Sequence, residues 1–312
     1  MKTIFVVNPQ AGHGDRAEAV MTAAGEAGER LGEEVECYLT QSVGDATEFV
    51  RGWLNSHPEE EARFVACGGD GTVNEVLNGL IGHPKAMLGI MPIGSGNDFC
   101  RNFPGADFLN AEAQLKGEGV RCDAIRYTST TPEGLLETRY CVNMFNIGFD
   151  CNVVDATSHF KGRKFISGSM AYFLGILTTM IRKKGADLRI VADGEEKQNG
   201  KLMLTSIANG QFCGGGIRSN PTADVHDGTI DLNIVYDVPR RRFVTLLPKY
   251  MKGTHVTLKN IGQFSLQCRK ITVEPLEGSM RVCIDGETGD SRGLTLEAVR
   301  DAFTLSVPPK KG

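Results

Sequence analysis

The sequence contains no uninterrupted apolar run of about 18 residues, so we expect no membrane-spanning helix. The apolar run from Ile4 to Val7 is too short for a signal peptide and suits a first strand. The nine cysteines never form a Cys-x-x-Cys pair. Their odd number and scattered spacing favour reduced thiols in a cytoplasmic protein over a disulfide framework or a zinc site.

An excess of positive charge is also absent. The formal net charge is -4, whereas a nucleic-acid-binding domain is usually basic, so we expect no nucleic-acid partner. The sequence has no G-x-x-x-x-G-K-[ST] P-loop and no H-R-D or D-F-G set, which excludes P-loop NTPases and protein kinases. With 312 residues, 41% hydrophobic and 23% charged, the chain is long enough for two globular domains.

The first third of the chain alternates between strand and helix patterns. This order predicts a mostly parallel sheet that is covered by helices. The expected strands are 4–7, 34–38, 64–66 and 87–91, and the expected helices are 17–31, 46–54 and 73–81.

The remainder of the chain consists of short strand-like runs separated by Gly, Asp and Asn, which predicts an antiparallel sandwich or barrel. Residues 229–236 alternate between apolar and polar, as is typical of a strand with one buried face. Two helix-like stretches, 167–181 and 243–252, interrupt this pattern. We therefore expect domains at 1–123 and 124–312, and the sequence leaves open which domain the last residues join.

A glycine-rich loop from Gly68 to Gly71 joins the third expected strand to the next helix. Its glycines allow positive φ angles and close approach of another backbone. Thr72 and Glu75 have the spacing of a capping box, which predicts that the helix begins at Val73. Since the amide groups at a helix N-terminus bind anions, we expect a phosphate at this loop.

Asp70 lies at the tip of this loop, where a bare carboxylate would repel a triphosphate. A magnesium ion between the two removes the conflict, because phosphoryl transfer uses Mg²⁺ and Mg²⁺ prefers oxygen ligands. The alternative is a tight strand-to-helix turn in which Asp70 is only solvated.

A second loop, with Gly94 and Gly96, follows the expected strand 87–91 and leads into Asn97 and Asp98. Asn and Asp are also favoured helix caps, which is the alternative for this pair. A third loop, residues 8–14, follows the first strand. Ligands of open parallel sheets bind beyond the carboxyl ends of the strands, so the three loops predict one site.

These motifs resemble the catalytic domain of the diacylglycerol kinase and sphingosine kinase superfamily, in particular the bacterial soluble lipid kinases. The resemblance rests on Asn8-Pro9 with Gly12, on "GGDGTVNEVLNGL" and on "PIGSGNDFCRNF". In the second half, "FNIGFDCNVV", "ANGQFCGGG", "NPTADVHDGTIDL" and "CIDGE" follow in the order typical of that family. The resemblance implies an α/β N-terminal nucleotide-binding domain with a parallel sheet, like phosphofructokinase and NAD kinase, and a C-terminal antiparallel β-sandwich domain.

The resemblance also implies a set of site residues. Asp70, Asp98 and Asp123 match acidic positions that organise Mg²⁺ and water near the phosphates. Ser95 stands where many relatives have threonine, a mild departure because the hydroxyl is kept. The residues that would line the ATP site are Asn8, Pro9, Gln10, Ala11, Gly12, Thr40, Gly68, Gly69, Asp70, Gly71, Thr72, Asn74, Glu75, Ser95 and Asn97.

Two further sites follow from the resemblance. Asp285 matches the general base of the family, with Glu287 beside it, and the sequence leaves open which of them accepts the proton. The alternative for Asp285 is an Asp-Gly hairpin turn. Asp227, with the backbone carbonyls of Asp224 and Thr229, matches a structural site for Mg²⁺ or Ca²⁺, and the alternative is a plain loop before a strand.

The function implied by the resemblance is an ATP- and Mg²⁺-dependent lipid kinase in phospholipid biosynthesis, which phosphorylates a lipid alcohol acceptor, most simply diacylglycerol to phosphatidic acid. The alternatives are an NAD kinase-like phosphotransferase and a nucleotide-sensing relative that has lost catalysis. Residues 161–184 form an apolar run with basic residues at both ends. This pattern suits either a core helix or a helix that makes peripheral contact with the inner face of an anionic membrane. A homodimer is left open.

Overall fold

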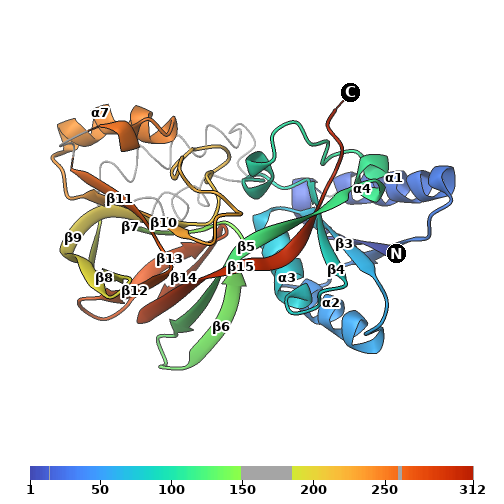
Figure 1. Ribbon diagram of the computed structural model, residues 1–312, viewed down its shortest axis with the longest axis horizontal. Coiled ribbons are helices and arrows are strands. Elements are labelled where there is room, and N and C mark those ends of the chain that lie inside the picture. The colour runs from blue at the N-terminus through green and yellow to red at the C-terminus, as the bar shows by residue number, and fades with distance from the viewer. Residues whose placement is uncertain (14, 149–184, 259–261, 312) are drawn as a thin grey trace. The chain divides into compact units, whose positions relative to one another are not determined.

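The computed structural model describes residues 1–13, 15–148, 185–258 and 262–311, so the expected membrane segment 161–184 lies outside the described residues. None of the helices it describes is both long and apolar enough to cross a membrane. Figure 1 shows the elements. The first part of the chain forms β1 (Lys2–Val7), η1 (Ala11–His13), α1 (Asp15–Leu31), β2 (Val35–Leu39), α2 (Asp45–Ser56), β3 (Ala62–Gly68), α3 (Asp70–Leu80), β4 (Ala86–Pro92), η2 (Phe99–Asn102), α4 (Ala111–Leu115) and β5 (Glu118–Thr130).

The second part of the chain is mostly strands. It forms β6 (Leu136–Cys141), β7 (Met144–Gly148), β8 (Ala186–Ala192), β9 (Glu195–Ala208), β10 (Ile230–Tyr236), α7 (Arg240–Met251), η3 (His255–Thr257), β11 (Gln263–Cys268), β12 (Lys270–Pro275), β13 (Met280–Ile284), β14 (Glu287–Ser291) and β15 (Gly293–Val307). The chain divides into two compact units, one of Met1–Ala124 with Arg300–Gly312 and one of Ile125–Val299. Strands β5 and β15 each contribute residues to both units.

The first unit contains a parallel sheet with the strand order β15-β4-β3-β1-β2. Strands β1, β3 and β4 are buried along almost their whole length, as expected for a parallel sheet with helices on both faces. Helices α1 and α4 pack on one face against Phe5 and Val65, and α2 and α3 cover the other (Figure 1). The predicted α/β fold class of this unit is confirmed.

The start of α3 differs from the prediction, because the helix begins at Asp70 and not at Val73. Its N-cap residue is Gly69, which has no side chain to cap the helix. The Thr72 hydroxyl accepts a hydrogen bond from Asn8 Nδ2 (3.2 Å) instead of acting as a cap. The prediction of a capping box was wrong, because the side chains of Thr72 and Glu75 form hydrogen bonds with residues outside α3.

The second unit is built from antiparallel strands, which confirms the predicted class. Strand β9 is long enough to join two parts of the sheet: its first half pairs with β8, and its second half pairs with β7 and β10. Strand β10 is buried on both faces, not on one as predicted, with Leu232 in one apolar cluster and Val235 in another. The expected helix 243–252 is present as α7, which covers the second of these clusters with Leu246 and Tyr250.

Candidate active site

The loop after β1 is tied to the glycine-rich loop after β3. The backbone N–H of Asn8 donates to the carbonyl of Cys67 (3.0 Å), and the Asn8 side chain reaches Thr72 in the first turn of α3. Gly12 has a φ of 66°, a left-handed conformation that glycine adopts without strain. The carboxyl ends of β1 and β3 therefore meet at one edge of the sheet, as the sequence predicted.

The loop after β4 lies directly against the same glycine-rich loop. The N–H of Gly94 donates to the carbonyl of Gly68 (2.9 Å), and a Cβ on Gly94 would lie only 2.3 Å from Gly69 Cα. No other residue type fits such a close approach. The Asn97 side chain donates to the carbonyls of Pro92 (3.1 Å) and Gly94 (2.8 Å) and so fixes the shape of this loop.

Two acidic residues of these loops are held next to each other. The N–H of Asp98 donates to Oδ1 of Asp70 at 2.8 Å. A Cβ on Gly96 would lie 2.6 Å from Oδ2 of Asp70 and 3.4 Å from Oδ2 of Asp98, so both oxygens border the space that Gly96 leaves open. Asp98 is an N-cap residue but makes no side-chain cap hydrogen bond, and its carboxylate pairs with Arg101 (3.5 Å).

The donor atoms of this edge fit a magnesium ion. Asp70 and Asp98 supply carboxylate oxygens, and Oδ1 of Asn97 is buried without a hydrogen-bond partner in the described part of the chain. Mg²⁺ in kinases takes one or two carboxylates and completes its shell with phosphates and water. A full cage of protein ligands is therefore not needed, and the described residues contain no group of three or more His, Cys, Asp or Glu that could form one.

The other residues expected to line the ATP site from these loops also lie at this edge. Gln10 donates its N–H to Oδ1 of Asn8 (2.9 Å), and Ala11 donates its N–H to the Asn8 carbonyl (3.1 Å). Thr40 follows β2, and its N–H donates to the carbonyl of Val7 (3.0 Å). Ser95 is exposed in the loop after β4. These contacts bring four strand ends to one place.

Two residues of the expected ATP-site set, Glu75 and Asn74, form side-chain hydrogen bonds with α2 and α3. Glu75 is buried, and its Oε2 accepts a hydrogen bond of 3.3 Å from the N–H of Ala46 in the first turn of α2. The N-cap of α2 is Gly44, which has no capping side chain, so Glu75 supplies the cap from the neighbouring helix. The side chain of Asn74 accepts from Asn78 (3.1 Å) along α3.

Asp123 is buried on β5, and its Oδ1 accepts a hydrogen bond of 2.8 Å from the N–H of Asp301 on β15. Asp301 has a φ of 50°, so this contact holds an unusual backbone conformation. Two residues further along β15, the ring of Phe303 packs against Phe99, which follows Asp98. Asp123 thus belongs to the first unit and anchors β15 there.

Asp285 is almost completely buried, with 4% of its surface exposed. Its carboxylate accepts hydrogen bonds from the N–H groups of Val142 (2.8 Å), Asn143 (3.0 Å) and Met144 (3.0 Å), and from the Cys141 thiol (3.1 Å). Burial, and after it the charge of Asp285, raises the pKa of the Cys141 thiol well above its ordinary value. The thiol therefore stays protonated and donates to the carboxylate.

The backbone around Asp285 forms the hairpin turn that the sequence left as an alternative. Ile284 pairs with Glu287 across β13 and β14, which leaves Asp285 and Gly286 as a two-residue turn. Both have positive φ angles, 46° and 90°, as a type I′ turn requires. Glu287, in contrast to Asp285, is exposed.

The expected second metal loop is ordered by hydrogen bonds of its own. Oδ1 of Asp227 accepts from the N–H (2.8 Å) and the hydroxyl (2.6 Å) of Thr229, and Oδ2 accepts from Gln267 (2.9 Å). Oδ1 of Asp224 accepts from the N–H of His226 (3.1 Å). These hydrogen bonds fix the conformation of the loop before β10, and they do not identify a ligand for it.

Sequence reasoning missed one link between the loops. Arg16, in the first turn of α1, donates from Nη1 to the carbonyl of Ile93 (3.3 Å) and packs its Cδ against Gly12. This cation joins the loop after β1 to the loop after β4. Its sequence signal was only a basic residue shortly after a glycine-rich loop, which is too common to identify a site.

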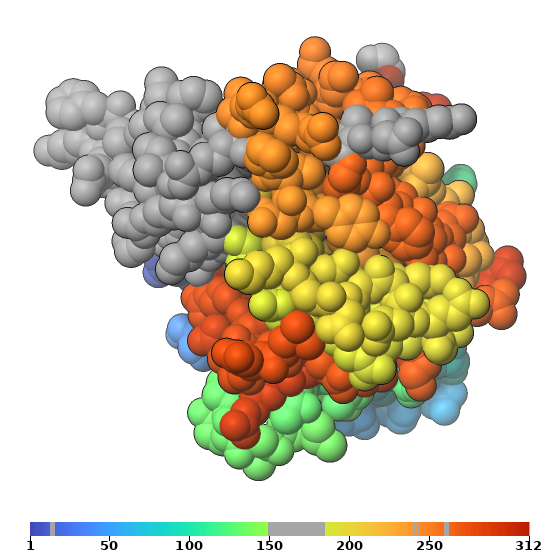
Figure 2. Space-filling model, turned by 90° about the vertical axis from the view of Figure 1, so that its left-hand side faces the viewer, coloured from blue at the N-terminus to red at the C-terminus, as the bar shows by residue number. Residues whose placement is uncertain are grey.

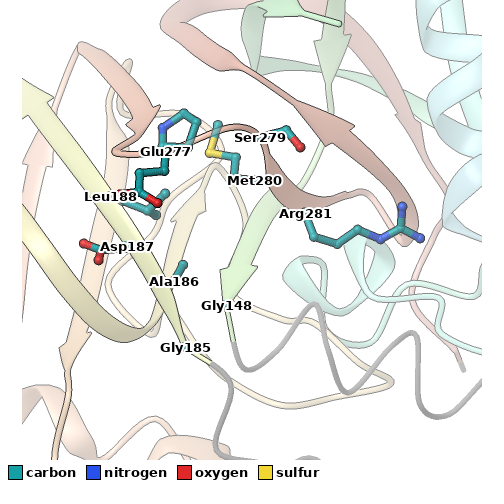
Figure 3. A pocket seen from close by; sticks show the side chains of 10 residues that line it. Gly148, Gly185, Ala186, Asp187, Leu188, Glu277, Ser279, Met280 and Arg281 are labelled. Atoms are coloured by element: carbon teal, nitrogen blue, oxygen red, sulfur yellow. The ribbon is translucent and has the colours of Figure 1, made fainter. Parts of the chain in front are cut away.

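The second unit also contains a pocket of about 290 Å³ next to β8 and β13 (Figure 3). In Figure 3 the Arg281 side chain points away from the other labelled side chains of the pocket. It contacts Asp290 (3.4 Å) and Thr288 (3.0 Å) on β14. The walls mix charged and apolar side chains, so we assign the pocket no ligand. It is lined by Gly148, Gly185, Ala186, Asp187, Leu188, Pro275, Glu277, Ser279, Met280 and Arg281.

The fold and this site define a two-domain phosphotransferase. Residues 2–127 match the model of the diacylglycerol kinase catalytic domain, and residues 143–307 match that of the YegS C-terminal NAD kinase beta sandwich-like domain. The chain belongs to the family of bacterial diacylglycerol kinases and YegS-like lipid kinases. It is a kinase that uses ATP to phosphorylate a lipid, as the resemblance implied.

Its relatives cover nearly the whole chain. It is 30% identical over 316 residues to a probable YegS-like lipid kinase of Pseudomonas aeruginosa, covering 98% of this chain and 94% of that protein. It is 28% identical over 314 residues to a diacylglycerol kinase of Mycobacterium tuberculosis, covering 98% and 95% of the two chains.

Solved structures share the fold. A diacylglycerol kinase from Bacillus anthracis has a TM-score of 0.72 at 24% identity, covering 99% of this chain and 97% of that one. Yeast NADH kinase has a TM-score of 0.50 at 8% identity, covering 99% and 84% of the two chains. These likenesses concern the fold, which confirms the predicted relation to NAD kinase at that level.

Proposed function

We propose that this lipid kinase phosphorylates diacylglycerol to phosphatidic acid with Mg²⁺-bound ATP. The observation that carries the proposal is the pair Asp70 and Asp98, whose Oδ2 atoms border the open space at Gly96 among three strand-end loops. Several relatives are named diacylglycerol kinase, which supports this acceptor over other lipid alcohols.

The first-unit loops would bind the phosphates of ATP. The amide groups in the first turn of α3 lack helical carbonyl partners and offer an anion site, and Asp70 opens that turn. Asp70 and Asp98 would hold Mg²⁺, which supplies charge neutralisation on the phosphates when bound. Arg16 and Arg101 add two cations at the same edge.

The chemistry also needs a proton acceptor. The lipid hydroxyl oxygen attacks the γ-phosphorus, the bond to the β,γ-bridging oxygen breaks, ADP leaves and the hydroxyl proton passes to a base. We assign this proton to Glu287, because its carboxylate is exposed. Asp285 is a positioning residue in this proposal, since both of its oxygens already hold the turn from Cys141 to Met144.

The second metal site, at Asp227 with the carbonyls of Asp224 and Thr229, is proposed from the resemblance alone. Carboxylate and carbonyl oxygens suit Mg²⁺ or Ca²⁺. A rise in melting temperature with either ion, lost in Asp227→Asn but kept in Asp187→Asn, would support it.

The proposal is tested by transfer of labelled γ-phosphate from ATP to a panel of acceptors. The panel contains diacylglycerol, phosphatidylglycerol, a sphingoid base and NAD, and lipid products are extracted into organic solvent. We expect a labelled lipid that runs with phosphatidic acid, and loss of the label when EDTA removes divalent ions. A stronger signal from another lipid alcohol would keep the kinase and replace the acceptor.

A further inference from the structure

Helix α7 has an outer face that the proposed reaction does not use. Its inner face is fixed by Leu246 and Tyr250, which are buried and pack in one cluster with Val235 and Val238. The helix itself lies at the surface of the second unit, in the orange part of Figure 2. The side chains opposite Leu246 and Tyr250 therefore point away from the core.

An apolar row runs along this outer face. Val244, Pro248 and Met251 are spaced by four and three residues, which places them on one side of a helix of 3.6 residues per turn. Val244 is 49% exposed, Met251 is 38% exposed, and Pro248 is also exposed. Packing against the described residues of the unit does not account for an apolar row on the side that faces away from the core.

Basic side chains lie to one side of this row, between it and Leu246. Arg241, Arg242, Lys249 and Lys252 are exposed, and none of them has an ion-pair partner in the part of the chain that the structure describes. The stretch 238–273 contains eight Lys and Arg residues and no Asp or Glu, within a chain of net charge -4. The charge of the chain is therefore distributed unevenly, with α7 in its most basic stretch.

We propose that the outer face of α7 docks on an anionic membrane surface. The four cations would bind lipid phosphates, and the row of Val244, Pro248 and Met251 would enter the headgroup region. A second copy of the chain is a poorer partner, because a two-fold contact through this face would set like charges against each other. The proposal requires only that the acceptor is a membrane lipid, so it does not depend on diacylglycerol.

The charge part is tested by sedimentation with vesicles of phosphatidylcholine, with or without phosphatidylglycerol. We expect the parent to bind only the anionic vesicles. The variant Arg241→Gln, Arg242→Gln, Lys249→Gln, Lys252→Gln should bind at least tenfold more weakly, since each cation near such a surface contributes about 1 kcal/mol, about fivefold in affinity.

A matched control removes the same charge elsewhere. Lys85, Lys116, Arg189 and Lys270 are exposed cations that already pair with carboxylates, so changing all four to Gln should leave vesicle binding within about twofold of the parent.

Turnover of the α7 variant on a dispersed short-chain diacylglycerol should stay parental. If the parent itself does not phosphorylate that lipid, the proposed acceptor fails while the vesicle measurement still tests α7.

The apolar part is tested with Val244→Trp and vesicles that carry brominated acyl chains. We expect quenching of the new tryptophan but not of Trp53 in the parent. Thr245→Trp, on the polar side of the helix, should be quenched less. Unchanged binding of the fourfold α7 variant, equal binding to neutral vesicles, or loss of a dimer without loss of vesicle binding would each overturn the proposal.

Discussion

The backbone N–H of Asp98 donates a 2.8 Å hydrogen bond to Oδ1 of Asp70. This contact joins the loop after β4 to the first residue of α3 and leaves Oδ2 of both carboxylates beside Gly96. This hydrogen bond from the backbone fixes the position of the Asp70 carboxylate relative to the loop after β4.

Asp70→Asn should lower turnover at least about 10²-fold, the scale of losing one preorganised charge contact. The fold should be kept, because Oδ1 of the amide can still accept from Asp98. The measurement is kcat with labelled ATP, together with the melting temperature. Asp290→Asn, an exposed change on β14, is the control. Turnover close to that of the parent would contradict the role given to Asp70.

Gly96→Ala should reduce turnover by about 10²-fold, because its Cβ would lie 2.6 Å from Oδ2 of Asp70 and displace that carboxylate. The backbone at Gly96 has no positive φ, so the loop itself should tolerate alanine. Gly25→Ala, where a Cβ meets nothing within 4 Å, should leave turnover unchanged. Parental activity in Gly96→Ala would mean that the space between the two carboxylates is not used.

Glu75→Gln should lower the free energy of unfolding by about 1 kcal/mol, because the charge on Oε2 that caps α2 at Ala46 is lost. The KM for ATP should not change, since the contacts of Glu75 are with α2. Urea unfolding and steady-state kinetics measure the two effects, with Glu137→Gln, an exposed change on β6, as a control. A raised KM at unchanged stability would return Glu75 to the ATP site.

Asp285→Asn and Glu287→Gln should differ in kind. In Asp285→Asn an amide nitrogen replaces an oxygen that accepts from backbone N–H groups, so the free energy of unfolding should fall by about 2 kcal/mol. Glu287→Gln should lower kcat with stability and KM for ATP unchanged. The pH dependence of kcat separates the two roles. Removal of the general base abolishes the acidic limb of the profile, which is the fall in kcat at low pH, whereas loss of a positioning residue leaves this limb in place. If that limb disappears in Asp285→Asn and persists in Glu287→Gln, the assignment is reversed.

His255 should make stability depend on pH. Burial lowers its pKa from 6.5 to about 4, and its ring contacts Asn233 (3.0 Å). The unfolded chain therefore binds the proton more readily between these values, so stability is full above about pH 6.5 and falls by up to about 3 kcal/mol towards pH 4. His255→Gln should flatten this part of the curve in chemical unfolding. The exposed His226→Gln should not, and an unchanged slope in His255→Gln would refute the attribution.

The helices and strands of the first unit could be predicted from sequence because their signals are local. Strand 64–66 and helix 73–81 follow from the periodicity of apolar residues, and both exist with ends shifted by a few residues. The glycine-rich loops were recognisable because only glycine tolerates backbone contacts such as Gly94 against Gly69.

The partners of individual polar side chains could not be predicted in this way. Thr72 and Glu75 have the spacing of a capping box, yet Asn8 and Ala46 are their partners. Both partners lie far away in the sequence, and only the parallel order of β1, β2 and β3 brings them near.

The sequence by itself determined the α/β pattern, the three loops after parallel strands and the family, because periodicity, glycine positions and ordered motifs are properties of short stretches. The tertiary structure alone decided that the Asp285 carboxylate holds the N–H groups of residues 142–144, and that α7 turns Val244 and Met251 outward. Such facts depend on which distant segments pack together. They are set by burial and by the need of buried polar groups for hydrogen-bond partners across the whole unit.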